Sequence, residues 1–283
     1  MPLDGPLASL GGFEIDAARL GAGSLSGIHL DSDLVATMVD DRARWAQARI
    51  VLRDGRTQAL EPIASGLLRD GAGRALPRGH AGDAEAIARL PDGTWLVAFE
   101  RWHRIRAYRR LDGPGAYVDA PPGLARAPRN GGLEALTALA DGRLLAIAED
   151  LEPPGRPRLR RGWVGRPGSW TPVAWRNAPP FVPVGAAGLP DGGALVLERR
   201  FSIFGGFAAR LVRVAPAALR DARRDGVLEG EEILRLDGHP LPAENFEGVG
   251  VARHDGRTIV ALVTDDNESV LQRLLMLVFE LRD

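Results

Sequence analysis

Acidic residues stand at both ends of a short apolar segment in the middle of this 283-residue chain. Residues 131–150 read GGLEALTALADGRLLAIAED, so Glu134 precedes one apolar stretch and Glu149 follows a second one. Asp141-Gly142 separates the two stretches, and this dipeptide is typical of a tight β-hairpin turn. A hairpin of this kind brings both glutamates to the same end, where carboxylate oxygens can bind a hard cation such as Ca²⁺.

The same phrase occurs in two other places. Residues 83–100 read DAEAIARLPDGTWLVAFE, and Glu85 lies 15 positions before Glu100, as Glu134 lies 15 positions before Glu149. Residues 245–266 repeat the order of acid, apolar stretch, Asp-Gly or similar turn, apolar stretch and acid. The recurrence predicts a repeated structural unit that delivers acids to equivalent places.

Two weaker copies complete the series. One has Ser26 at the opening position and Asp40-Asp41 at the closing position. The other has Val184 where the opening acid is expected, and it closes with Glu198. The copies begin about 50 to 60 residues apart, which is the spacing of β-propeller blades.

The repeat therefore predicts an all-β fold: a single β-propeller domain over residues 1–283. The length favours six blades, with five as the alternative. The first strand-like segment, residues 11–20, and the last, residues 273–283, are expected to pair and close the ring, because an open edge strand is a liability.

In such a ring the bracketing acids converge at one mouth of the central channel. The candidate metal ligands are Asp40, Asp41, Glu85, Glu100, Glu134, Glu149, Glu198, Glu247, Asp265 and Asp266. Like charges this close repel one another unless something compensates them. A divalent cation would do so, and Ca²⁺ is the expected one. The alternative is a network of ion pairs with arginine that only caps the channel.

Arginines accompany several of these acids. A guanidinium group binds phosphate or carboxylate in a bidentate manner, so an anionic ligand at the same mouth is expected. The candidate anion-binding residues are Arg101, Arg104, Arg199, Arg200 and Arg273. His103 stands between two of them and is a candidate site residue.

Composition excludes several classes of protein. The net charge is −1 and there is no cysteine, which excludes disulfides and thiolate chemistry and gives no global field that would attract nucleic acid. No apolar run is long enough to cross a membrane, and the first residues lack the pattern of an intact signal peptide. We expect a monomer whose partner is a small anion or a metal ion.

The ordered segments SGIHLDSD, DAEAIARLPDGTWLVAFERWHRI, GGLEALTALADGRLLAIAE, LPDGGALVLERRFS, NFEGVGV and DDNESVLQRLLMLVFEL resemble the bacterial phytase-like family, also described as having esterase-like activity of phytase. The resemblance implies a β-propeller that is exported to the periplasm or secreted, and a hydrolase of phosphate esters or related esters; a cytoplasmic location is the alternative. Members commonly read D-D-N-F where this chain has Asp-Asp-Asn-Glu, ending at Glu268.

For a hydrolase of this kind we take Glu85, Glu134 and His103 as the candidate catalytic residues. Two other functions remain open from the sequence. One is a non-catalytic periplasmic protein that binds a metal ion or a small ligand, and the other is a scaffold for protein partners.

Overall fold

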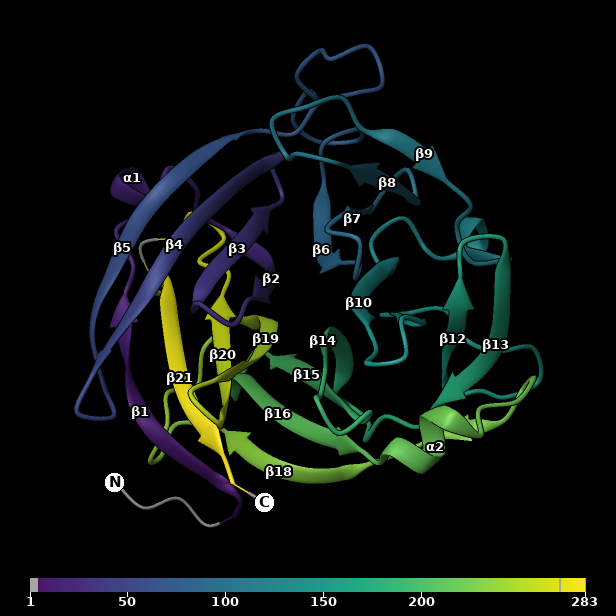
Figure 1. Cartoon of the computed structure of the whole chain (residues 1–283). Helices are drawn as coiled ribbons and strands as arrows, with labels where there is room; N and C mark the ends of the chain where they lie inside the picture. The colour runs from purple at the N-terminus through teal and green to yellow at the C-terminus, as the bar shows by residue number, and fades with distance from the viewer. Residues whose placement is uncertain (1–4, 270, 283) are drawn as a thin grey trace.

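The computed structural model describes residues 5–269 and 271–282, and the chain forms five sheets around one axis, antiparallel except for one short parallel edge strand (Figure 1). The fold is thus the expected all-β propeller, with five blades and not the six that the length favoured. Among the described helices none is long and apolar enough to cross a membrane.

Each blade begins with the strand nearest the axis. Blade 1 comprises β2 (Leu25–Leu30), β3 (Val35–Asp40), β4 (Arg44–Arg53) and β5 (Arg56–Leu67). Blade 2 comprises β6 (Ala84–Arg89), β7 (Trp95–Phe99), β8 (Arg104–Tyr108) and β9 (Ala116–Val118). Blade 3 comprises β10 (Leu133–Ala138), β11 (Leu144–Ala148), β12 (Arg160–Arg166), β13 (Ser169–Trp175) and the short β17 (Val227–Leu228).

Blade 4 comprises β14 (Val182–Gly188), β15 (Ala194–Ser202), β16 (Gly206–Val214) and β18 (Glu231–Leu236). Blade 5 comprises β19 (Phe246–His254), β20 (Arg257–Thr264), β21 (Leu275–Leu281) and β1 (Leu7–Glu14). The described helical segments are short: α1 (Ala17–Leu20), a 3₁₀ turn (Leu124–Arg126) and α2 (Pro216–Arg220).

The ring is closed by the two ends of the chain, as the sequence predicts. Strand β1 pairs antiparallel with β21, from Leu7 opposite Leu281 to Glu14 opposite Leu275, and so covers the outer edge of blade 5 (Figure 1). This pairing joins the first and last parts of the chain in one sheet and removes an open edge.

The Asp-Gly pairs form the turns between the first two strands of blades 2, 3 and 4. The glycines Gly93, Gly142 and Gly192 have φ values of 87°, 77° and 92°, which suit glycine because it has no Cβ. In blade 3 the Asp141 carboxylate accepts the backbone N–H of Arg143 at 2.9 Å, which fixes the turn. The three turns therefore hold the strand pairs in the same register.

Five apolar clusters lie between neighbouring blades. One example joins blades 1 and 2 through Val39, Trp45, Ile87 and Phe99, and equivalent clusters join each remaining pair, including blade 5 with blade 1. A flat sheet has two faces to bury, and stacking the blades in a ring buries both. The blades are thus held at fixed angles, and their inner strands at fixed distances from the axis.

Truncating a buried side chain of the closing strand should destabilise the whole ring. Leu10 in β1 is 5% exposed and packs in the cluster between blades 5 and 1. We expect Leu10→Ala to lower the free energy of unfolding by about 2 to 5 kcal/mol. Glu14→Ala in the same strand, where the side chain is exposed, should change it by less than about 0.5 kcal/mol. Urea unfolding measures both, and equal stability of the two variants would mean that β1 does not close the ring.

Candidate functional site

Every inner strand carries a β-bulge near its start, at the second residue in four strands and at the third in β14. The pairing skips one residue between Leu25 and Gly27, and the other four inner strands have the same irregularity. A bulge leaves one residue outside the ladder and redirects its side chain. The skipped residues are Ser26, Glu85, Glu134, Val184 and Glu247. These are the opening positions of the sequence repeat, so the fold places them in one layer around the axis.

A second layer follows from the ends of the next strands. In blade 2 the Glu100 N–H donates to the Asp83 carbonyl at 2.8 Å, and in blade 3 the Glu149 N–H donates to the Gly132 carbonyl at 2.8 Å. In the other three blades, the pairing between the first two strands identifies the residue at the matching position. The second layer consists of Asp41, Glu100, Glu149, Arg199 and Asp265.

Blade 4 therefore contributes an arginine to the second layer where the other blades contribute an acid. Arg199 lies 15 positions after Val184, the same spacing that separates Glu134 from Glu149. Its guanidinium group donates to Glu149 at 3.1 Å and to Asn245 Oδ1 at 2.7 Å, and it forms an ion pair with Glu247. One positive charge thus bridges carboxylates that come from blades 3 and 5.

Three of the predicted metal ligands, Asp40, Glu198 and Asp266, lie outside both layers. Asp40 is fully buried and accepts the backbone N–H of Arg44 at 2.8 Å and its Nε at 2.6 Å. Glu198 is also fully buried and accepts Trp175 Nε1 and Arg210 Nε, both at 2.6 Å. Asp40 and Glu198 each precede a second-layer residue by one position, and successive side chains of a strand point to opposite faces. These two acids belong to structural ion pairs within and between blades.

Asp266 lies beside the second layer. Its Oδ1 accepts the backbone N–H groups of Ser24 at 3.1 Å and Glu268 at 3.3 Å. The Glu268 carboxylate, the departure from the family pattern, forms an ion pair with Arg42, which also lies 3.6 Å from Asp41. The additional acid is therefore neutralised at the rim.

The buried acidic cluster can hold a metal ion. Carboxylate oxygens of Asp83, Glu85 and Glu100 lie within 4.8 Å of one another, and so do those of Glu100, Glu134 and Glu149. Glu100 belongs to both groups. Oxygen ligands in this number suit Ca²⁺ or Mg²⁺ better than softer metals.

Burial and mutual repulsion raise the pKa values of these acids. Burial, followed by the nearby carboxylates, raises the pKa of Asp41 to about 6. Burial raises the pKa of Glu100 to about 7, although the backbone N–H of Gly132 donates to Glu100 Oε1 at 2.9 Å and opposes the rise. For Glu85 and Glu134, burial and neighbouring carboxylates place the pKa well above the ordinary value of 4.5. Without a cation, these groups take up protons near neutral pH.

His103 and Glu100 both lie close to Gly132. His103 Nε2 lies 3.0 Å from the Pro128 carbonyl oxygen, which only accepts hydrogen bonds, so Nε2 is the donor in this contact. Nδ1 is buried and has no hydrogen-bond partner among the described residues. A Cβ on Gly132 would lie 2.4 Å from this atom, so glycine is needed there to admit the imidazole ring.

The other predicted anion-binding arginines differ in their surroundings. Arg101 Nε lies 2.5 Å from Asp83 Oδ2, at the edge of the acidic cluster. Arg104 is buried and donates to the carbonyls of Trp102 and Ala81. Its guanidinium group is thus directed away from the axis.

The last two lie farther around the rim. Arg200 stands 5.7 Å from the centroid of the Phe181 ring, and Arg273 forms an ion pair of 2.7 Å with Glu244. Of the five predicted arginines, only Arg101 and Arg199 contact carboxylates of the cluster, at Asp83 and at Glu149 and Glu247.

The acidic end of the central channel, which we call the funnel, is formed by the two layers of residues described above. Its floor is very narrow. A cavity of about 10 Å³ lies between the inner strands, with Ser26, Glu134 and Glu247 in its lining, and this volume accommodates about one water-sized sphere. The residues after the bulges are small, and a Cβ on Gly185 would lie 2.7 Å from the Glu247 carbonyl oxygen. An ion fits at this depth, and an organic substrate must bind nearer the mouth.

Sequence reasoning missed Asp83 and Asn245 as site residues. Each lies two positions before a bulged glutamate, and the Asn245 amide donates to Glu247 at 2.9 Å. The signal was present in the repeat, since the phrases DAEA and NFEG both place a polar residue two positions before the glutamate.

Comparisons with known proteins agree with this fold. The model of the phytase-like family, described as esterase-like activity of phytase, matches residues 21–268. The search of curated proteins found no match.

Solved structures resemble this chain at low sequence identity. The PQQ domain of pyranose dehydrogenase from Coprinopsis cinerea has a TM-score of 0.52 and 11% identity, over 96% of this chain and 94% of that one, and this likeness concerns the fold. Aldose sugar dehydrogenase from Streptomyces coelicolor has a TM-score of 0.46 and 15% identity, over 98% of this chain and 99% of that one. Virginiamycin B lyase from Staphylococcus aureus has a TM-score of 0.43 and 11% identity, over 90% of this chain and 66% of that one.

The raised pKa values predict an unusual dependence of stability on pH. Between pH 5.5 and 8 the folded, chelated protein binds more protons at this cluster than the unfolded chain does, so its free energy of unfolding should fall as pH rises. Glu100→Gln should flatten this slope and stabilise the protein at pH 8 by up to about 3 kcal/mol, the equivalent of the Glu100 pKa rise.

Urea unfolding in the presence of a chelator, at several pH values, measures this slope. Asp221→Asn is the matched control, because that side chain is 74% exposed and lies on α2's C-terminal side. The control should keep the slope of the unsubstituted protein. Stability that rises from pH 5.5 to 8 would contradict the raised pKa values.

Proposed function

We propose that this protein, which belongs to the phytase-like family, is an exported, metal-dependent hydrolase of phosphate esters or related esters. The observation that carries the proposal is the two groups of three carboxylates that share Glu100, a residue of the second layer. Carboxylates with raised pKa values in a concave site are typical of functional centres.

Asp83, Glu85, Glu100, Glu134 and Glu149 are the residues that would hold the ion. Ca²⁺ is the proposed ion, because its coordination is flexible and its ligands are oxygens. When bound, a divalent ion would act as a Lewis acid toward an ester oxygen and would neutralise the carboxylates. Because the cavity between the inner strands holds about one water-sized sphere, the ester would have to bind nearer the mouth.

The residues of the chain have separate roles in this proposal. Glu85 and Glu134 would be the catalytic carboxylates, because both lie in the first layer around the axis. His103 would hold Glu100 in place through packing at Gly132. Arg101 would orient the anionic group, because its Asp83 partner is also a metal ligand and the guanidinium group is partly exposed.

A second candidate function is the non-catalytic binding of a metal ion. The cavity of about 10 Å³ favours it, because the floor accommodates an ion without a substrate. Arg199 already bridges Glu149 and Glu247, so among the described residues the group that Arg199 does not contact is Asp83, Glu85 and Glu100. Binding without turnover would distinguish this function from hydrolysis.

Metal binding should stabilise the chelated protein. At a hundredfold excess over the dissociation constant, the gain is about 2.7 kcal/mol, or roughly 5 to 10 °C in Tm for a chain of this size. Glu134→Gln should reduce the shift, because it removes one charged ligand and keeps the shape of the side chain. Thermal unfolding with added Ca²⁺, Mg²⁺ or Mn²⁺ measures the shift.

Turnover is measured in parallel with 4-nitrophenyl phosphate and 4-nitrophenyl acetate. Hydrolysis that depends on the ion and is lost in Glu134→Gln supports the hydrolase. A shift in Tm without turnover of either compound supports the binding function, and the absence of a shift with every ion would contradict both.

The Arg101 guanidinium group should be needed for an anionic substrate. Arg101→Lys keeps the charge and loses the bidentate fork, so we expect KM for the phosphate ester to rise about tenfold, which corresponds to ~1.4 kcal/mol. Arg110→Lys is the control: Arg110 lies in the same blade and forms an exposed ion pair of 2.6 Å with Asp112. Equal KM values for the two variants would assign Arg101 to the scaffold.

A further inference from the structure

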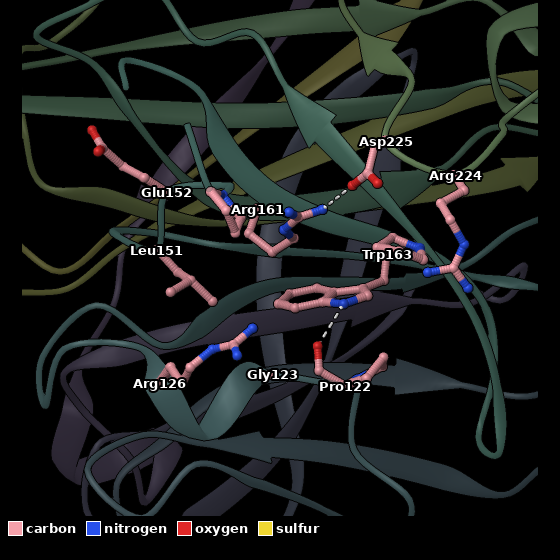
Figure 2. Close-up of a pocket in the computed structure, with 11 residues that line it drawn as sticks. Pro122, Gly123, Arg126, Leu151, Glu152, Arg161, Trp163, Arg224 and Asp225 are labelled. Carbon is pink, nitrogen blue, oxygen red and sulfur yellow. Dashed lines mark hydrogen bonds and ion pairs between the residues drawn. The ribbon is translucent and has the colours of Figure 1, made fainter. Parts of the chain in front are cut away.

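A second cleft lies away from the acidic funnel, at the outer part of blade 3, and has a volume of about 450 Å³ (Figure 2). It is bounded by the connection between β9 and β10, the connection between β11 and β12, the strands β12 and β13, and the loop before β17. Clefts of 300 to 1,000 Å³ are of the size that binds small organic molecules.

Apolar side chains form the floor and walls of this cleft. Trp163 is fully buried beneath the cleft, where its indole Nε1 donates to the Pro122 carbonyl at 3.2 Å (Figure 2). Leu151, Pro154 and Pro172 complete the apolar lining. Rigid proline rings and a buried indole keep the shape of such a cleft with little loss of side-chain entropy when a ligand binds.

Three arginines line the same cleft. Arg161 is neutralised by Asp225, with Nη1 to Oδ1 at 2.9 Å. Arg126 and Arg224 lie on opposite sides of Trp163 in Figure 2, and within the described part of the chain neither forms an ion pair. Glu152, the remaining acid of the lining, lies 3.7 Å from Arg160 and accepts the backbone N–H of Arg158.

The charge of this cleft is opposite to that of the funnel. Two guanidinium groups without carboxylate partners match the charge of −1.5 to −2 that a phosphate monoester carries near neutral pH. Arginine binds such oxygens with parallel hydrogen bonds, and the apolar floor suits the organic part of the molecule.

We propose that this cleft binds a small organic phosphate monoester, with the phosphoryl group bound by Arg224 and the apolar body against Leu151, Pro154 and Pro172. The site is separate from the carboxylates of the funnel and goes beyond the proposed function, because it requires neither a metal ion nor a reaction.

Isothermal titration calorimetry of the full chain with phenyl phosphate, in the presence of a chelator, tests the site independently of the funnel. We expect phenyl phosphate to bind more tightly than inorganic phosphate and than phenol, because only phenyl phosphate uses both Arg224 and the apolar lining. Arg224→Gln should raise the Kd for phenyl phosphate about tenfold, the cost of a lost charged hydrogen bond.

Two further variants separate this site from non-specific binding. Arg223→Gln removes the neighbouring exposed arginine, which does not line the cleft, and should leave the Kd unchanged. Leu151→Phe should narrow the cleft and weaken binding, while Tm reports that the variant is folded. Equal Kd values for Arg224→Gln and Arg223→Gln, or equal binding of phenyl phosphate and inorganic phosphate, would overturn the proposal.

Discussion

The repulsion among carboxylates around the central axis is the interaction on which the site depends. Asp41, Glu85, Glu100, Glu134 and Glu247 all have pKa values raised by burial and by one another. The ring that holds them is fixed by five apolar clusters between blades, so the acids cannot move apart. Arg199 offsets part of the charge, and protons or a cation must offset the rest.

The β-bulges explain how a simple hairpin becomes a ligand-bearing unit. Without the bulge, alternation along the strand would continue and the skipped residue would face a neighbouring blade. With it, the redirected glutamates of blades 2, 3 and 5 line the axis, while Ser26 and Val184 leave blades 1 and 4 uncharged in that layer. The first layer is therefore asymmetric, with its charge gathered at three blades. One group of potential metal ligands comes from blade 2 alone, and the other joins Glu100 of blade 2 to Glu134 and Glu149 of blade 3.

The sequence could predict the fold and much of the site, because the spacing within the repeat reflects the backbone geometry of each hairpin. The spacing of the acids and the Asp-Gly turns identified the hairpins and the end of the channel at which the acids lie.

The length of the chain predicts one blade too many, because β4 and β5 of blade 1 span 10 and 12 residues and the first strand completes blade 5 and does not begin a sixth blade. The spacing of 15 residues indicates Arg199 as the second-layer residue of blade 4, whereas the acidic side chain favours Glu198 as a metal ligand. The burial of Glu198 beside Trp175 and Arg210 depends on contacts far away in sequence. The ion pair between Asp40 and Arg44 likewise depends on the geometry of the turn between β3 and β4, which the sequence does not specify.

The most direct test is a crystal structure of the protein grown with Mn²⁺ as an anomalous scatterer. The account predicts an anomalous peak within coordination distance of Glu100 and of carboxylates from one of its two groups, and loss of that peak in Glu100→Gln crystals. A structure of the unsubstituted protein at neutral pH with no peak in the funnel would contradict the account, and would show that Arg199 and protons alone compensate the ring of acids.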